Sequence, residues 1–338
     1  MTIAKRLRIV VIIACAIPTV IVAACYIAPL PTAASLTALQ RAATGVSHRE
    51  IQLPSGASIA YLDSDIAAPA DKPVLLLLHG ITSNKDIWLQ LISHFDSYRV
   101  IAVDMPGHGD SRETEDFDYR VENLSQQIAV FIETLSLPPA HLVGNSLGGL
   151  VAALYSVEHP NRVKSLVLMN SAGIDAPQRS AMMQRAMDDR SYNPLVVETM
   201  DDIAPKLAAV LAHPPTLMAP IRQLMLAQEL SRLEANNRLF SAVLADESNI
   251  NKLELLLPRL TTPAMLLWGD GDQVFHYSSV AKAIDLAPAL GAHIIEDCGH
   301  LPMLEAPAKS AAVLHGFFHT PGLVQASTEP TPEVMSAG

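Results

Sequence analysis

The chain has 338 residues, half of them hydrophobic and 17% charged, with a formal net charge of −11. This length suffices for one large domain or two small ones, with a core that needs no covalent cross-links. The three cysteines provide no disulfide framework. The body is acidic and has no basic run, which argues against nucleic acid as a partner.

The N-terminal residues 1–30 form a segment of their own. After the basic stretch "MTIAKRLR", 19 residues without a charge run from Ile9 to Ile27. As a helix they would extend for about 28 Å, close to the thickness of a bilayer core. Because the basic residues precede the apolar run, that end is expected in the cytoplasm and the body outside it. We therefore expect one uncleaved N-terminal membrane helix, a signal anchor.

Two other interpretations of this segment stay open. The stretch "VAAC" resembles the processing box of bacterial lipoproteins, in which Cys25 would carry the lipid. A secretory peptide cleaved after Ala34 would instead release the body. In the anchored form, residues 31–45, rich in Pro, Ala and Thr, are expected to be a linker.

Beyond this linker, apolar runs of strand length alternate with segments of helical period. Their near-continuous Val, Leu and Ile content predicts strands buried on both faces, as in a parallel sheet. The alternation predicts an α/β fold with helices on both faces of that sheet. The expected strands lie within residues 57–62, 74–80, 99–109, 140–146, 163–173, 263–272 and 292–300, and the clearest helices within 121–137, 147–160, 278–290 and 306–318.

This alternation stops between residues 174 and 260, where helical periods and several prolines occur without a strand pattern. We expect a helical cap there, inserted into a core of residues 46–173 and 261–318. The C-terminal residues 319–338 are rich in Pro, Thr, Ser and Glu and are expected to be a disordered tail.

The stretch "GNSLG" lies between a predicted buried strand and a predicted helix. In a Gly-x-Ser-x-Gly turn the serine projects its hydroxyl above the sheet, which makes Ser146 the candidate nucleophile. Gly144 and Gly148 are needed because a side chain at either position would collide with the neighbouring strand or helix. The N-terminal amides of the helix that starts at Leu147 favour negative charge at the same place.

A serine hydroxyl needs a base, and the base needs a carboxylate that orients it. His300 follows the last apolar strand, in a glycine-containing loop before a helix. Asp270 and Asp272 both follow the strand "AMLLW" and compete for the role of the acid. The order Ser146, Asp272, His300 matches the Ser…Asp…His order of enzymes with this serine turn.

Two backbone amides are candidates for an oxyanion hole. The strand "LLLLHG" ends at His79 and Gly80, and the amide of Ile81 can face Ser146 after the turn. With the amide of Leu147 it would supply two donors to a tetrahedral oxyanion. We interpret His79 as a structural residue that braces this turn.

Together these segments resemble the α/β-hydrolase superfamily. The likeness covers roughly residues 46–318 and rests on "HGITSNKDIW", "DMPGHGDS", "GNSLGG", "NSAG", "WGDGDQV" and "CGHLPMLEAP", all in family order. It is strongest to bacterial triacylglycerol lipases and membrane-anchored monoacylglycerol lipases. The resemblance implies a mostly parallel eight-stranded sheet with a helical cap, and it places the acid at Asp272 and a variable position at Asp270.

The sequence therefore predicts a serine carboxylic-ester hydrolase, a lipase or esterase that cleaves lipid or other apolar acyl esters through Ser146. No metal or organic cofactor is implied, because the His and Asp positions show no metal-ligand spacing. An alternative is a carbon–carbon bond hydrolase of ring-cleavage products with the same triad. A cap arginine facing the pocket would favour it, and the candidates are Arg179, Arg185, Arg190 and Arg222. A non-catalytic, membrane-tethered binding protein is disfavoured by the intact triad.

Overall fold

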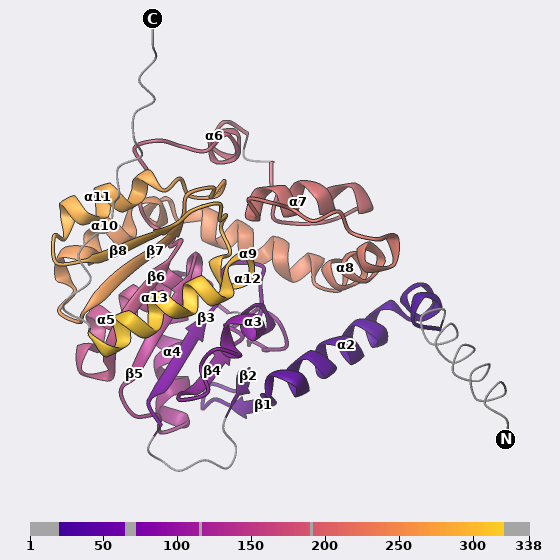
Figure 1. Cartoon of the computed structure of the whole chain (residues 1–338), viewed down its shortest axis with the longest axis horizontal. Helices are drawn as coiled ribbons and strands as arrows, with labels where there is room; N and C mark the ends of the chain where they lie inside the picture. Colours follow the sequence, from indigo (N-terminus) through magenta and orange to yellow (C-terminus); the bar gives the residue numbers. More distant parts are fainter. Residues whose placement is uncertain (1–19, 65–71, 115–116, 190–191, 321–338) are drawn as a thin grey trace, which may run out of the picture.

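A computed structural model of the chain describes residues 20–64, 72–114, 117–189 and 192–320. Within these residues lies one sheet of eight strands, in the order β1-β2-β4-β3-β5-β6-β7-β8 (Figure 1). The β1–β2 and β2–β4 pairs are antiparallel and all other pairs are parallel. The predicted α/β fold with a mostly parallel eight-stranded sheet is confirmed. The strands are β1 (Ser47–Gln52), β2 (Ser58–Asp63), β3 (Val74–Leu78), β4 (Arg99–Val103), β5 (Ala140–Asn145), β6 (Val163–Met169), β7 (Ala264–Gly269) and β8 (Gly291–Ile295).

The two faces of the sheet carry separate hydrophobic clusters. Side chains alternate along a strand, so Val74, Leu76 and Leu78 of β3 join one cluster. Leu75 and Leu77 join the other, and all five side chains are buried. Helices cover both faces, as the sequence predicted. The first face packs against α4 (Val121–Thr134), α5 (Leu147–Glu158) and α11 (Ser278–Leu286), and the second against α3 (Leu89–Ile92), α12 (Pro302–Glu305) and α13 (Pro307–His319).

Every element described between β6 and β7 is helical. The last of these helices returns to the sheet, because Leu253, Leu256 and Leu257 belong to the first core cluster and α10 packs on α5. Of the segment 174–260, the C-terminal part thus packs as core, while the preceding helices stand beside the sheet (Figure 1). The helices are α6 (Ala181–Asp188), η3 (Met200–Asp202), α7 (Ile203–Val210), α8 (Ala219–Ser231), α9 (Leu233–Ala245), η4 (Glu247–Ile250), α10 (Lys252–Leu256) and η5 (Leu257–Arg259).

Residues 31–45, expected to be a linker, are instead almost entirely helical, in α2 (Pro29–Thr44). Pro29 and Pro31 lie in the first turn, where a missing N–H breaks no intrahelical hydrogen bond. The following residues are mostly Ala, Leu, Gln and Arg, which favour a helix. Gly45 ends it in the left-handed conformation, with φ of 75°. The linker prediction is corrected for this reason.

Helix α2 belongs to the folded body. It packs along α8, where Ala33 and Leu224 form a small buried cluster with Cys25. At its other end, Arg41 Nε and Nη2 each lie 2.6 Å from a carboxylate oxygen of Asp86, next to the sheet. Such a two-point guanidinium–carboxylate pair fixes orientation as well as distance.

The predicted membrane segment lies mainly outside the described residues, which begin at residue 20. Residues 20–27 are helical and expose apolar side chains, among them Ile27 at 82%. Within the described ranges, no helix combines the length and apolar character needed to cross a bilayer. The predicted tail also lies outside them from residue 321 onward.

Candidate active site

Ser146 occupies the turn between β5 and α5. Its φ of 56° and ψ of −122° are a backbone conformation that residues with side chains rarely adopt. Its N–H donates to the Met169 carbonyl and its carbonyl accepts from the Ala172 N–H, both at 3.0 Å. Bonds to the end of the neighbouring strand and the loop after it therefore hold the strained turn in place.

Two glycines make this turn possible. A Cβ built on Gly144 would lie 2.2 Å from the Gly148 carbonyl oxygen, and one built on Gly148 would lie 2.3 Å from the Leu78 carbonyl oxygen. Both contacts are to backbone atoms that no side-chain rotation can move away. The strand, the helix and β3 approach so closely that only glycine fits at both positions.

The predicted base and acid contact each other. His300 Nδ1 lies 2.9 Å from Asp272 Oδ2, and both residues are buried. Asp272 Oδ1 accepts hydrogen bonds from the N–H groups of Val274 at 2.7 Å and Phe275 at 3.0 Å. Because Oδ2 contacts Nδ1 of the ring, the carboxylate favours the tautomer of His300 that carries its hydrogen on Nδ1. In that tautomer Nε2 is free to accept a proton.

Asn145 joins the histidine loop to the serine turn. Its Nδ2 donates to the carbonyl oxygens of His300 and Met169, each at 3.1 Å. Because Asn145 directly precedes Ser146, this places the backbone of His300 beside the turn. The described residues contain no hydrogen bond between Ser146 Oγ and the His300 ring, and in unliganded hydrolases this bond is often long.

The second candidate acid has a different position. Asp270 donates its N–H to the Ile295 carbonyl at 3.1 Å, and its Oδ1 accepts from the Cys298 N–H at 3.4 Å. It joins the end of β7 to the end of β8 and to the histidine loop through backbone groups. Of the two aspartates, only Asp272 has a recorded contact with the imidazole of His300.

Asn170 also bonds to the candidate acid, Asp272, and sequence reasoning missed it. Its Nδ2 donates to Asp272 Oδ2 at 2.7 Å and to the Gly299 carbonyl at 3.3 Å. Its φ of 45° lies in the left-handed region, at the first residue after β6. The available signal was an asparagine in "NSAG", directly after a buried strand, at the same sheet edge as the other site residues.

His79 orients the candidate oxyanion turn. Its Nδ1 lies 2.7 Å from the Gly80 carbonyl oxygen, and its Nε2 accepts from the Met105 N–H at 3.1 Å. Burial lowers the pKa of His79 to about 4, so the ring is neutral and Nδ1 carries the donated hydrogen. In a trans peptide the C=O and N–H point in opposite directions, so fixing the Gly80 carbonyl also fixes the direction of the Ile81 N–H.

Gly80 lies against Ser146, the candidate nucleophile. A Cβ built on it would lie 2.9 Å from the Cβ of Ser146. The Ile81 amide therefore follows a backbone segment in contact with Ser146. Leu147 is the first residue of α5, so its N–H has no intrahelical acceptor. The geometry is compatible with both predicted oxyanion donors.

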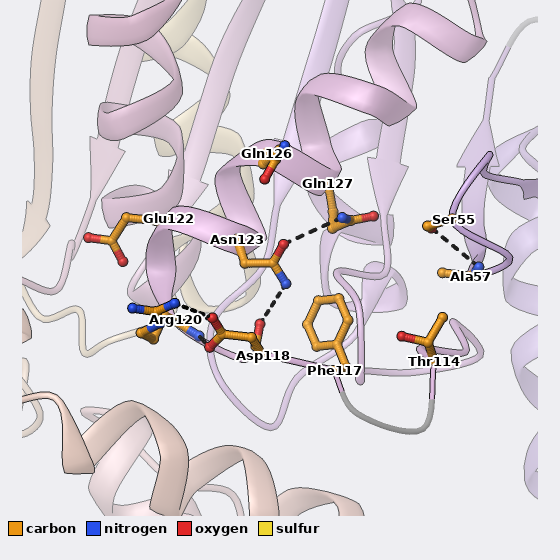
Figure 2. Close-up of a pocket in the computed structure, with 10 residues that line it drawn as sticks. All are labelled: Ser55, Ala57, Thr114, Phe117, Asp118, Arg120, Glu122, Asn123, Gln126 and Gln127. Atoms are coloured by element: carbon orange, nitrogen blue, oxygen red, sulfur yellow. Dashed lines mark hydrogen bonds and ion pairs between the residues drawn. The ribbon is translucent and has the colours of Figure 1, made fainter.

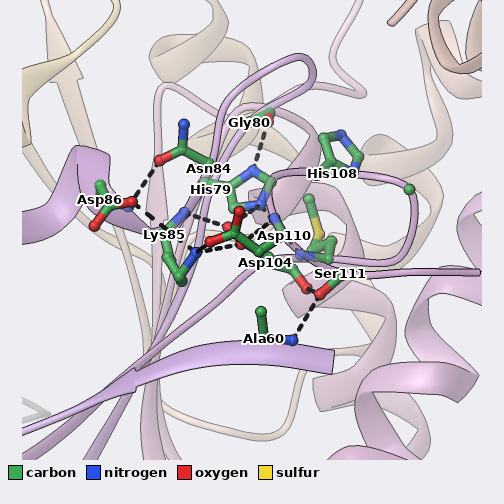
Figure 3. A network of polar contacts seen from close by, with 12 residues as sticks. Ala60, His79, Gly80, Asn84, Lys85, Asp86, Asp104, His108, Asp110 and Ser111 are labelled. Atoms are coloured by element: carbon green, nitrogen blue, oxygen red, sulfur yellow. Dashed lines mark hydrogen bonds and ion pairs between the residues drawn. The ribbon is translucent and has the colours of Figure 1, made fainter. Parts of the chain in front are cut away.

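A buried ion-pair network supports the loop that carries this turn (Figure 3). Lys85 is 1% exposed, and its Nζ lies 2.6 Å from Asp104 Oδ2 and 2.7 Å from Asp110 Oδ2. The Lys85 N–H donates to Asp104 Oδ1 at 2.6 Å, and the Asp110 N–H donates to Asp104 Oδ2 at 2.8 Å. These bonds tie the loop after β3 to the loop after β4.

Among the cavities that the described residues line, two have none of Ser146, Asp272 and His300 in their walls. A groove of about 380 Å³ lies near the start of α4 and the β1–β2 turn, lined by Phe117 and Asn123 among others (Figure 2). A second cavity of about 460 Å³ lies between α2, the loop after β3 and cap helices α8 and α9. It reaches Thr82 and Ser83, which directly follow Ile81. In the described parts of the chain, no three His, Cys, Asp or Glu side chains are placed to hold a metal ion.

Comparison with known proteins identifies the family. The family model for the alpha/beta hydrolase fold matches residues 73–307, and the chain belongs to this family. The sequence resemblance is thereby confirmed.

Its relatives include proteins named as lipases. Monoacylglycerol lipase abhd6-B of Xenopus laevis is 30% identical over 74% of this chain and 76% of its own length. Lipase 1 of Psychrobacter immobilis is 27% identical over 78% of this chain and 81% of its own. The crystal structure of a membrane phospholipase A, described as a bacterial virulence factor, superposes with a TM-score of 0.80 and 31% identity. The superposition covers 94% of this chain and 99% of the phospholipase chain.

Two glycine substitutions, one at the serine turn and one in an open position on α13, are predicted to have opposite effects on stability. Gly148→Ala should destabilise the protein by about 1–3 kcal/mol or more, because the new methyl group meets backbone atoms. Gly316 lies in α13, and a Cβ built on it has nothing within 4 Å. Gly316→Ala should therefore stabilise the protein by about 0.5–1 kcal/mol. Thermal unfolding of the two purified variants measures both effects. Equal melting temperatures would contradict the close packing at the turn.

Proposed function

We propose that the protein is a serine carboxylic-ester hydrolase, with Ser146 as nucleophile, His300 as base and Asp272 as acid. The observation that carries this proposal is the 2.9 Å contact between His300 Nδ1 and Asp272 Oδ2, on a loop that Asn145 holds beside the strained Ser146 turn. Membership of the α/β-hydrolase family and the lipases among the relatives support it.

The reaction follows from the positions of these groups. Ser146 Oγ attacks the ester carbonyl carbon while His300 Nε2 takes the hydroxyl proton, and Asp272 stabilises the imidazolium. The N–H groups of Ile81 and Leu147 donate to the oxyanion, each worth about 3–4 kcal/mol in a dry site. Collapse of the intermediate expels the alcohol, which receives the proton from His300. Water then gives a proton to His300 and attacks the acyl carbonyl carbon. Collapse of this second intermediate breaks the bond to Ser146 Oγ, which takes the proton back from His300, and the carboxylic acid leaves.

The contacts of the cap arginines do not favour the alternative, a carbon–carbon bond hydrolase. Arg179 and Arg185 are exposed, and Arg222 donates to the Met200 carbonyl within the cap. Arg190 lies outside the described residues. None of the three candidate arginines that the structure describes contacts Ser146, Asp272 or His300 in the interactions given for it. The substrate class that we propose is an acyl ester with an apolar chain. The names of the relatives, monoacylglycerol lipase and lipase, support this class.

The N-terminal segment is proposed to attach the enzyme to a membrane, with the catalytic body outside the cytoplasm. The charge-free run from Ile9 to Ile27 and the exposed apolar side chains of residues 20–27 support this proposal. Cys25 is only 2% exposed and packs against Ala33 and Leu224, which favours an anchor over a lipid attached at Cys25.

Ser146→Ala is expected to abolish ester hydrolysis and leave the fold intact. The hydroxyl forms the acyl-enzyme, and loss of a triad nucleophile costs about 10⁶-fold in turnover. The test compares purified wild type and variant on p-nitrophenyl esters of rising chain length, mono- and triacylglycerols and a ring-cleavage diketone. Turnover of the diketone alone, or a variant with a substantial fraction of wild-type ester turnover, would sink the proposal.

The two aspartates provide a matched pair. Asp272→Asn should lower turnover by about 10⁴-fold, because the amide no longer orients the ring tautomer and stabilises its charge. Asp270→Asn should change turnover little and act mainly on stability, since its recorded bonds go to backbone groups. Turnover on one soluble ester and the melting temperature are measured for both variants. The reverse order of activity losses would refute Asp272 as the acid.

Truncation separates the proposed anchor from the catalytic body. A chain that begins at Pro29 should leave the membrane fraction and still hydrolyse a soluble short-chain ester, because α2 and the motifs are retained. A chain that begins at Val46 lacks α2 and the pair between Arg41 and Asp86, so its melting temperature should be lower. Sedimentation with vesicles and thermal unfolding are the measurements. Continued sedimentation of the first chain would show that another surface binds the membrane.

A further inference from the structure

Glu305, the last residue of α12, binds three backbone amides from two parts of the chain. Its Oε1 accepts from the Gly299 N–H at 2.9 Å and from the Leu301 N–H at 3.4 Å, on either side of His300. Its Oε2 accepts from the Ala212 N–H at 2.8 Å, in the cap directly after α7. One half-buried carboxylate thus joins the histidine loop to the cap.

The same two segments also contact each other directly. The His300 N–H donates to the carbonyl oxygen of Val210, the last residue of α7, at 3.0 Å. A Cβ built on Gly299 would lie 2.6 Å from the Ala212 nitrogen, so the two backbones are in close contact. Together with the bonds of Glu305, these contacts pack the end of α7 against the histidine loop.

We propose that Glu305 is a positioning residue that holds His300 in register with Ser146 by clamping the histidine loop to the cap at Ala212. This inference rests on the proposed function, since His300 must be the base for its position to matter. Glu305 does not reach the reacting atoms. It acts through the backbone on both sides of His300, and the C-terminal end of α7 stays docked when substrate binds.

The chemistry of a carboxylate explains why glutamate suits this place. Both oxygens accept hydrogen bonds, so one side chain can serve N–H groups on opposite sides. Burial raises the pKa of Glu305, while its bonds to the amides of Ala212, Leu301 and Gly299 favour the charged form. A glutamine has one acceptor oxygen, and its amide nitrogen would face an N–H donor, so Glu305→Gln must release either the loop or the cap.

A displacement of His300 should lower the rate of the chemical step. A misplacement of about 1 Å in a catalytic group costs on the order of 100-fold in rate. We expect Glu305→Gln and Glu305→Ala to lower kcat about 10- to 100-fold, with little change in KM.

Glu254 offers a matched control. It is also half-buried, and its Oε1 accepts from the Asp175 N–H and from Lys282 Nζ, both at 2.7 Å. It joins the start of the inserted segment to α11 without a recorded contact to the histidine loop. Glu254→Gln should therefore lower the melting temperature and leave kcat unchanged.

The experiment measures kcat, KM and melting temperature of the full chain on one soluble ester for wild type, Ser146→Ala and the three glutamate variants. If Glu305→Gln does not fold, Glu305→Asp, which keeps the charge but is one methylene too short to span both sides, replaces it. A selective loss of kcat at position 305 supports the clamp. Unchanged kcat in a folded position-305 variant, or an equal loss in Glu254→Gln, overturns it. Absence of ester turnover in wild type, or full turnover in Ser146→Ala, would instead refute the proposed function.

Discussion

The turn at Ser146 concentrates two costs in one place, a backbone conformation that side chains disfavour and contacts too close for any Cβ. A φ of 56° with ψ of −122° costs of order 1–3 kcal/mol, and it persists only because the surroundings determine it. The carbonyl of Ser146 accepts from the N–H groups of Gly149, Leu150 and Ala172. The strained residue is thereby bonded into the helix and the neighbouring loop, and the other loops of the site are arranged around it.

Side chains that bind backbone groups hold these loops. Asn145 binds the carbonyl of His300, Asn170 binds the carbonyl of Gly299 together with the acid, and His79 binds the carbonyl of Gly80. Asn145 and Asn170 reach the histidine loop from the ends of β5 and β6, and His79 joins the loop after β3 to the loop after β4 through the Met105 N–H. The neutral His79 ring and the two amides add no charge of their own to this buried site, where an unpaired charge would be costly.

The sequence was informative where one residue pattern has one physical meaning. The run "VLLLL" alternates between two buried faces and was predicted as a parallel strand. The strand β1, "SHREIQ", was not among the expected strands, because its polar side chains alternate on an edge that is only partly buried. Helix α2 was expected as a linker, because prolines in a first helical turn look like breaks until the start of the helix is known. Asn170 was missed because its partners, Asp272 and the Gly299 carbonyl, are distant in sequence. Glu305 was missed because its bond to the distant Ala212 N–H, like those of Asn170, leaves no periodic signal.

The charges beside the candidate oxyanion turn connect the site to the N-terminal helix α2. Arg41 of α2 pairs with Asp86, the neighbour of Lys85, and Lys85 binds Asp104 with both its N–H and its Nζ. A buried pair of this kind costs about 3–5 kcal/mol when one partner is removed, because the other charge is left without compensation. Since Asp104 also accepts from the Asp110 N–H, the loops after β3 and β4 behave as one ion-paired unit. Because Arg41 joins α2 to Asp86, the segment proposed as a membrane anchor leads into a helix that is ion-paired to the loop of the candidate oxyanion turn.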